Sequence, residues 1–248
     1  MPVIVPYVPG GGLPLRSVAV IPARGGSKRI PRKNVRVLDG RPLIAWSIDT
    51  IRASAVFDAV VVSTDDDEIA DVARSAGALV PFRRPAELSD DHASTGSVIV
   101  HAIAQLSGLG LVTSDQDLLC CAYPAAIGVQ PDDYRRGREL LEASGAEYVT
   151  TVVRYAHPIQ RAMSVDDTGR IGLIDPAASE LRTQDLPARF HDAGQFYWGR
   201  VAAWATGLPI FPNSVALELP ASEVLDIDSE DDWLRAERLH SLRRRVEP

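Results

Sequence analysis

The chain contains only two lysines, Lys28 and Lys33, and both lie in the stretch IPARGGSKRIPRKN at positions 21–34. Arg24, Arg29 and Arg32 raise the number of cations in this stretch to five within ten residues. A lysine ammonium is a compact point charge, so a site shaped for it on a phosphate oxygen need not accept the planar guanidinium of arginine. In a protein with a net charge of -7, such a cluster predicts a site for a polyphosphate.

The same stretch contains Gly25 and Gly26, which allow positive φ and close approach of the backbone, so that successive N–H groups can point at an anion. We interpret Ser27 as a hydroxyl donor to phosphate, since no histidine partner for a nucleophile is evident. Neither G-x-x-x-x-G-K-[ST] nor G-x-G-x-x-G occurs here, which argues against a Walker-type loop and a dinucleotide-binding loop. The alternative interpretation is a solvated basic turn whose two lysines are close by chance.

A second candidate site is the carboxylate pair Asp226 and Asp228, near the end of the chain. The segment EVLDID at 223–228 has the pattern of a strand, in which residues two apart project from the same face. Two adjacent carboxylates repel each other unless a cation neutralises them, and Mg²⁺ prefers such oxygen ligands together with phosphate. The sequence therefore predicts a magnesium site; the alternative is a polar strand end at which Asp228 helps to cap the last helix.

These residues must be positioned by strands and helices that alternate from residue 17 onward. Strands are predicted at 17–23, 55–64, 78–81, 117–123, 147–155, 194–200 and 223–228. Helical spacing occurs at 41–54, 66–77, 97–106, 131–145 and 229–245, the last with Ser229 and Asp232 placed as a capping box. This order predicts an α/β fold with a mostly parallel, twisted sheet and helices on both faces. Because ligands bind beyond the carboxyl ends of parallel strands, the loop after the first strand is the expected place for chemistry.

Residues 156–193 interrupt this alternation. They are rich in proline, aspartate, arginine and glutamine and show no helix longer than a turn or two. We interpret them as an arm inserted in a single domain of residues 17–248, with residues 1–16 as a flexible N-terminal extension. A segment of 38 residues without its own core is costly to order unless it packs against something, which favours a homodimer.

Composition and charge exclude several classes of partner. The acidic net charge argues against a nucleic-acid or membrane surface, because those partners favour a basic field. No apolar run approaches the roughly 20 residues that cross a bilayer. The only two cysteines, Cys120 and Cys121, are neighbours in an apolar run, so we expect no stabilising disulfide and a reducing, cytoplasmic location.

Five stretches of the sequence, taken in order, resemble the CMP-sugar synthetases, the cytidylyltransferases of nine-carbon (nonulosonic) acids. They are IPARGGSKRIPRKN, VVSTDDDEIADVARSAGA, FRRPAELSDD, HDAGQFYWGR and LDIDSEDDW, and they span most of residues 17–240. PIQRAM, RTQDLP, HDAGQFYWGR and the paired cysteines before Tyr-Pro are most similar to the pseudaminic acid branch of that family. The resemblance implies a three-layer, Rossmann-like nucleotidyltransferase fold with an inserted dimerisation arm.

The reaction that this resemblance implies is transfer of CMP from CTP to the anomeric hydroxyl of pseudaminic acid, a nine-carbon 2-keto sugar acid, with release of pyrophosphate and with Mg²⁺ as cofactor. The implied catalytic residues are Arg24, Lys33, Asp226 and Asp228, of which the two aspartates would hold the metal. The implied nucleotide-binding residues are Ala23, Arg24, Gly25, Gly26, Ser27, Lys28, Lys33, Asn34, Arg84 and Tyr123. The implied sugar-binding residues are Gln160, Arg161, Arg182, Gln184, His191 and Asp192.

The sequence departs from the family pattern at residues 123–128. Tyr-Pro-Ala-Ala-Ile-Gly replaces the usual Tyr-Pro-Thr-Ala-Pro, and the missing threonine hydroxyl removes one possible hydrogen bond to sugar or nucleotide. Two alternatives therefore stay open. One is a synthetase for N-acetylneuraminic or legionaminic acid, and the other is a non-catalytic nucleotide-binding protein on the same fold.

Overall fold

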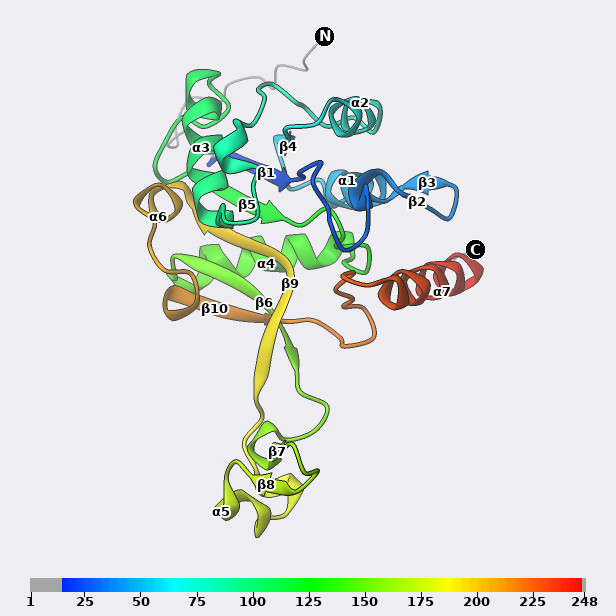
Figure 1. Cartoon of the computed structure of the whole chain (residues 1–248). Helices are drawn as coiled ribbons and strands as arrows, with labels where there is room; N and C mark the ends of the chain where they lie inside the picture. Colours follow the sequence, from blue (N-terminus) through cyan, green and yellow to red (C-terminus); the bar gives the residue numbers. More distant parts are fainter. Residues whose placement is uncertain (1–14, 247–248) are drawn as a thin grey trace.

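A computed structural model describes residues 15–246; all but two residues of the predicted extension at 1–16 lie outside this range. Six strands form one sheet in the order β10-β6-β9-β5-β1-β4 (Figure 1). They are β1 (Ser17–Pro22), β4 (Ala59–Ser63), β5 (Leu118–Ala122), β6 (Tyr148–Arg154), β9 (Phe190–Arg200) and β10 (Ser214–Glu218). Only β9 runs antiparallel to its neighbours in this sheet, so the sheet is mostly parallel, as predicted.

Helices cover both faces of the sheet (Figure 1). They are α1 (Leu43–Ser54), α2 (Asp67–Ser75), α3 (Thr95–Gly108), α4 (Pro131–Ser144) and α6 (Val201–Thr206). The last helix, α7 (Glu230–Val246), lies beside the sheet and shares a third, smaller core with Leu43 of α1. Residues of α1, α2 and α4 share one apolar core with the sheet, and residues of α3 and α6 share a second core with it. Ala19 and Ile21 of β1 belong to the first core and Val18 and Val20 to the second. The chain therefore folds as three layers, with β1 buried on both faces.

Short elements complete the domain. A two-stranded ribbon of β2 (Val37–Leu38) and β3 (Arg41–Pro42) precedes α1, and 3-10 turns occur at η1 (Lys33–Val35), η2 (Ala86–Leu88) and η5 (Phe211–Asn213). The predicted strand at 78–81 is wrong, because this segment makes only an isolated bridge between Leu79 and Val61. α6 and β10 were not predicted; β10 is an edge strand with mostly exposed or half-buried positions, which weakens its apolar pattern.

The arm leaves the sheet as a continuation of β6 and β9 (Figure 1). Beyond a register irregularity between Thr150 and Val152, the two strands pair as a ribbon in which Val153 lies opposite His191. β9 begins at Phe190, four residues earlier than the predicted strand at 194–200, because this ribbon extends pairing past the sheet. The tip contains η3 (Ile159–Arg161), β7 (Met163–Val165), β8 (Ile171–Leu173), α5 (Pro176–Ser179) and η4 (Thr183–Asp185).

Two further expectations concern the cysteines and membrane spans. Cys120 and Cys121 are free, fully buried thiols in β5, and burial raises the pKa of both. Both therefore pack as apolar side chains. Among the helices within residues 15–246, none is long and apolar enough to cross a membrane.

Candidate active site

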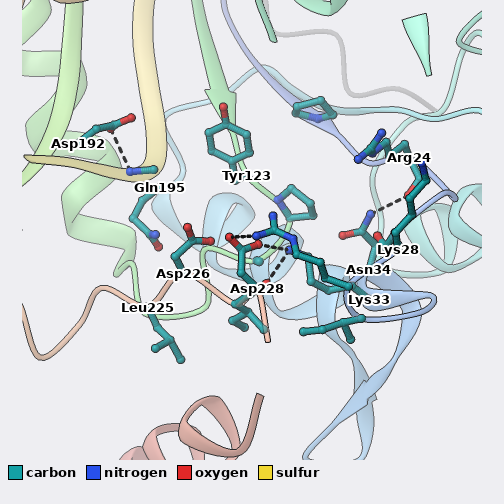
Figure 2. A pocket seen from close by; sticks show the side chains of 18 of the residues that line it. Arg24, Lys28, Lys33, Asn34, Tyr123, Asp192, Gln195, Leu225, Asp226 and Asp228 are labelled. Carbon is teal, nitrogen blue, oxygen red and sulfur yellow. Dashed lines mark hydrogen bonds and ion pairs between the residues drawn. The ribbon is translucent and has the colours of Figure 1, made fainter. Parts of the chain in front are cut away.

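A pocket of about 420 Å³ lies at the carboxyl ends of β1 and β5. Four segments far apart in the sequence form its walls: the loop after β1, the residues after β5, the start of β9 and the segment before α7. The lining residues are Pro22, Arg24, Ser27, Lys28, Arg29, Ile30, Lys33, Asn34, Tyr123, Pro124, Ala125, Asp192, Gly194, Gln195, Tyr197, Leu225, Asp226, Ile227 and Asp228. Figure 2 shows Arg24, Lys28 and Asn34 on one side of the pocket and Asp192, Gln195 and Asp226 on the other.

The cations of the loop after β1 are paired with carboxylates of the same chain. Arg24 Nη1 lies 2.6 Å from Asp91 Oδ1, and Lys28 contacts the other oxygen of that carboxylate. These two cations, Lys28 first, hold the pKa of Asp91 below its usual value. Arg32 contacts Asp66 and Glu68 on the outer side of the loop. An anion that enters the pocket at Arg24 and Lys28 must therefore replace Asp91.

Lys33 joins this loop to the segment before α7. Its Nζ donates to the backbone carbonyl of Ile227 at 2.7 Å and lies 3.6 Å from Asp228 Oδ1. Arg29 Nη1 lies 2.8 Å from the other oxygen of Asp228. The two candidate groups, which are almost two hundred residues apart in the sequence, thus face one another across one pocket.

Asp226 is the less neutralised member of the carboxylate pair. Although the residue is exposed, partial desolvation of its carboxyl and then the neighbouring charge of Asp228 raise the pKa of Asp226. Lys33 and Arg29 act in the opposite direction but do not cancel this effect. The carboxylates of Asp226 and Asp228 therefore suit a hard divalent cation, because one of them lacks a full counter-charge.

The predicted strand at 223–228 is wrong, since no strand within residues 15–246 pairs with this segment. It is an extended loop, and the alternation that suggested a strand has another cause. Ile227 is fully buried in a small core that also contains Ile30 of the cationic loop and Trp233 of α7. This apolar contact brings the two segments together and leaves Asp226 and Asp228, on either side of Ile227, to line the pocket.

The start of α7 forms the predicted capping box, and the alternative role of Asp228 as a helix cap is not observed. Asp232 Oδ2 accepts from the backbone N–H of Ser229 at 3.0 Å, and Ser229 Oγ accepts from the N–H of Asp232 at 3.3 Å, which is a capping box. The Asp228 side chain does not cap the helix, because its two oxygens face Arg29 and Lys33.

The glycines of the loop serve close approach rather than positive φ. Neither Gly25 nor Gly26 has a positive φ; the residue of this loop that adopts the left-handed conformation is Arg32, at φ 57°. A Cβ atom at Gly25 would lie 2.6 Å from Asp66 Oδ2, and the Gly25 N–H donates to Asp65 Oδ1 at 3.0 Å. We predicted that successive N–H groups of this loop point at an anion. One of them, the N–H of Gly25, is instead bonded to the carboxylate of Asp65.

The remaining residues expected on the nucleotide side differ in their position. Asn34 and Tyr123 line the pocket, and Asn34 Nδ2 donates to the Arg24 carbonyl at 3.0 Å, which holds the loop in shape. Ala23 is buried in the core and does not line the pocket. Arg84 is only 4% exposed and lies 3.6 Å from Asp65; burial lowers its pKa. It supports the loop from behind, since Asp65 also accepts from Gly25.

Of the six residues expected to bind sugar, the structure brings only Asp192 into the pocket. Gln160 Nε2 donates to the Pro187 carbonyl at 2.8 Å, and Arg161 Nη1 lies 3.3 Å from Thr183 Oγ1. Arg182 pairs with Asp185 at 2.8 Å, and His191 Nδ1 lies 2.9 Å from the carbonyl of Asp192. Gln184 is exposed on the arm. These five residues do not line the pocket of their own chain.

Sequence reasoning missed the polar wall formed by Gln195 and Tyr197. Both lie two residues apart on β9 and line the pocket, and Tyr197 donates its hydroxyl to Asp192. Tyr123 Oη lies 3.0 Å from Thr95 Oγ1, and burial raises the pKa of Tyr123 to about 12, so its hydroxyl stays neutral. The alternation of strand residues in GQFYWGR is the signal that could have identified this wall.

The loop that departs from the family pattern is held by a close backbone contact. A Cβ atom at Gly128 would lie 1.6 Å from the backbone oxygen of Glu223, so only glycine fits there. Ala125 lines the pocket, and Ala126 is buried below it. The altered loop is therefore well packed and supports the segment that carries Asp226.

Comparisons with known proteins agree with this geometry. The model of a family described as cytidylyltransferase matches residues 18–197. A pseudaminic acid cytidylyltransferase from Campylobacter jejuni is 38% identical over 229 residues, which cover 92% of this chain and 97% of that protein. A CMP-N,N'-diacetyllegionaminic acid synthase from Legionella pneumophila is 33% identical over 236 residues, with the same two coverages.

Among solved structures, CMP:2-keto-3-deoxy-manno-octonic acid synthetase complexed with CTP superposes with a TM-score of 0.66 at 19% identity. The superposition covers 92% of this chain and 99% of that one. At this level of identity the likeness concerns the fold, and it agrees with the three-layer architecture described above.

Proposed function

The chain belongs to the cytidylyltransferase family, and we propose that it transfers CMP from CTP to the anomeric hydroxyl of pseudaminic acid, with release of pyrophosphate. The similarity to the Campylobacter jejuni protein over nearly the whole of both chains supports this choice of acid. The observation that carries the proposal is the contact of Lys33 with both Ile227 and Asp228, since it brings the phosphate side and the carboxylate side within reach of one nucleotide.

In the proposed complex the triphosphate lies along the cationic loop. Arg24 and Lys33 would contact phosphate oxygens, with Ser27 as a neutral donor; all three line the pocket. Phosphate oxygens would replace Asp91 as the partner of Arg24 and Lys28. Cations held in a pocket before the substrate arrives stabilise charge without further reorganisation, and this is the main source of catalysis in phosphoryl-group transfer.

The proposed reaction is a displacement at the α-phosphorus of CTP. The anomeric oxygen of the acid forms a bond to this phosphorus, and the bond from phosphorus to the oxygen bridging the α- and β-phosphates breaks. Pyrophosphate leaves with that electron pair, and the hydroxyl proton passes to solvent water. Lys33 and Arg24 would offset the negative charge that builds up on the phosphate oxygens.

We propose Mg²⁺ as the cofactor, held by Asp226 and Asp228. The raised pKa of Asp226 next to Asp228 supports a missing counter-charge at this pair. No group of three or more metal-binding side chains occurs within the described part of the chain, so phosphate and water oxygens would complete the coordination. When bound, the ion would neutralise charge on the α-phosphate and on pyrophosphate.

We also propose that the enzyme acts as a homodimer in which the arm of one protomer reaches the pocket of the other. Two observations support this arrangement. Gln160, Arg161, Arg182 and Gln184 lie on the arm, outside the pocket of their own chain. The arm tip also exposes apolar side chains, among them Val165 at 68%, Ile171 at 66% and Ile174 at 65%. Such a surface suits contact with a second copy of the chain.

A cytoplasmic location is part of the proposal. Cys120 and Cys121 are neighbouring free thiols, which agrees with a reducing compartment. A fractionation of the producing cells that recovers the protein outside the cytoplasm would contradict it.

The test is an assay of pyrophosphate release with Mg²⁺, in which CTP and each other nucleoside triphosphate are combined with a panel of sugar acids. We expect turnover with CTP and pseudaminic acid and little with other nucleotides. Faster turnover of N-acetylneuraminic or legionaminic acid would identify the substrate as that acid instead. CTP binding in calorimetry without pyrophosphate release from any acid would favour a non-catalytic nucleotide-binding protein.

A further inference from the structure

Gln195 has a buried hydrogen-bond acceptor for which residues 15–246 provide no donor. The residue is only 2% exposed, yet it lines the active-site pocket. Its Nε2 donates to the backbone carbonyl of Ala193 at 2.9 Å. Only the NH₂ group of the side-chain amide can donate to the backbone carbonyl of Ala193. This bond therefore fixes which end of the Gln195 amide carries the oxygen. The remaining atom, Oε1, has no hydrogen-bond partner in the described part of the chain.

A buried acceptor without a partner is costly, and most such groups in native proteins are satisfied by protein, water or ligand. The unsatisfied acceptor of Gln195 lies in the wall of the pocket, where a ligand can reach it. A ligand that brings a donor to this place would recover the missing hydrogen bond. The unsatisfied atom is thus an indication of what the ligand offers, which is an O–H or N–H group.

The surroundings of Gln195 indicate which part of the ligand lies there. Tyr197 follows two residues later on β9 and also lines the pocket, with Asp192 accepting its hydroxyl. Figure 2 shows Gln195 and Asp192 on the side of the pocket away from Arg24 and Lys28. This wall has neutral polar groups and one carboxylate and lacks the cations that hold phosphate. It suits the hydroxyl and amide groups of a sugar rather than the triphosphate.

We propose that Gln195 Oε1 accepts a hydrogen bond from a hydroxyl or amide N–H of the sugar-acid acceptor, and that this contact helps to determine which acid is used. The inference rests on the proposed function, since it needs a sugar acid as the second substrate. Gln195 is thereby a substrate-binding residue on the main domain, in addition to the residues proposed on the arm.

The test compares the wild-type enzyme with Gln195→Met, which keeps the length of the side chain and removes the acceptor. We expect the KM for the sugar acid to rise about five- to tenfold, as for the loss of one hydrogen bond, while the KM for CTP stays within about twofold. Gln195→Asn retains a polar amide but withdraws the oxygen, and it should raise the same KM. It also provides a second variant should Gln195→Met fail to fold.

Thr151→Val is the matched control for loss of a buried polar group. Thr151 is fully buried on β6, donates to the Phe196 carbonyl at 3.0 Å and does not line the pocket. We expect this variant to lose thermal stability with both KM values unchanged. An unchanged sugar-acid KM in both Gln195 variants would overturn the inference, as would an effect on CTP or on the Mg²⁺ concentration dependence alone. Absence of turnover in the wild-type enzyme would instead count against the proposed function.

Discussion

The cationic loop after β1 and the arm differ in how many of their side chains line the pocket of a single chain. In the loop, each of the five cations has a carboxylate partner within the chain, and four of the five line one pocket. On the arm, Gln160, Arg161 and Arg182 contact other parts of the arm, and the tip leaves Ile171 and Val165 exposed. The loop is therefore preformed within one chain, whereas the arm tip exposes the apolar side chains that the proposed dimer would cover.

This difference indicates how the work of the site is divided. Phosphate binding depends on charges that must be held in place before the ligand arrives, and the loop, the small core around Ile227 and α7 hold them. In the proposed dimer, binding of the sugar acid by the arm would be completed by the surface of the second protomer. Changes in the loop should thus impair chemistry within each chain, and changes at the arm tip should act through assembly.

The largest expected effect is that of Asp228→Asn. Asp228 faces Arg29 and Lys33 and is a proposed metal ligand, so its neutralisation removes electrostatic stabilisation at the centre of the site. We expect kcat/KM to fall about 100- to 1000-fold in the pyrophosphate assay. Asp231→Asn, an exposed carboxylate on the first turn of α7, is the control and should retain activity. Near-normal activity of Asp228→Asn would contradict the proposed site.

At the arm, the double variant Ile171→Ser, Leu173→Ser should weaken the proposed dimer. Each apolar side chain is worth roughly 1.5–3 kcal/mol when fully buried, so the dissociation constant should rise about 100-fold or more. Light scattering over a range of concentrations measures this shift, and activity should fall with it. Val37→Ser, an equally exposed apolar position on β2, should change neither. A monomeric wild-type protein with full activity would exclude the arrangement.

Lys33→Arg tests whether the loop requires a lysine ammonium. Lys33 Nζ fits between the Ile227 carbonyl and Asp228, in a position where its side chain is 22% exposed, and a planar guanidinium is larger. We expect the KM for CTP to rise about tenfold, the loss of one charge-assisted hydrogen bond. Lys28→Arg is the matched control, because its side chain is 79% exposed and should accept the larger group. Equal effects of the two variants on the KM for CTP would contradict a specific requirement for lysine at position 33.

Asp226→Asn should stabilise the metal-free protein at neutral pH. The pKa of Asp226 is raised in the folded state, so the stability that its proton contributes is present at low pH and is lost as pH rises through the folded-state pKa. Above that value the charged carboxylate destabilises the fold. Thermal unfolding at pH 7 without Mg²⁺ should show a rise in Tm of about 2 °C, small because the residue is exposed. The gain should vanish below the usual aspartate range, around pH 3.

The smallest expected effect is that of Asp91→Asn. Asp91 pairs with Arg24 and Lys28 where phosphate is proposed to bind, so removing its charge frees both cations for CTP. Because these pairs are exposed, the KM for CTP should fall only about two- to fivefold, and less at high salt. Asp71→Asn, which breaks the pair with Arg74 on α2, should leave this KM unchanged. A higher KM in Asp91→Asn would mean that Asp91 orients the loop rather than competing with phosphate.

Local pattern predicted much of the fold and half of the site. β1, β5 and α4 lie within a residue or two of their predicted ranges, since strongly apolar or amphipathic runs have few alternatives. The same reasoning failed at 223–228, because alternation of apolar and acidic residues also describes an extended loop anchored by one buried isoleucine. It also missed Gln195, because a single amide side chain in a strand does not reveal whether the residue binds a ligand or only stabilises the fold.

The sequence by itself determined that five cations follow the first strand and that two aspartates flank one isoleucine, because these are properties of neighbouring residues. Only the tertiary structure decided that Lys33 meets Ile227 and Asp228, that Arg84 lies behind the loop and that Gln195 has an unused acceptor. These facts depend on how the folded chain brings separate segments together. The Lys33 contact, for example, follows from the joint burial of Ile30, Ile227 and Trp233.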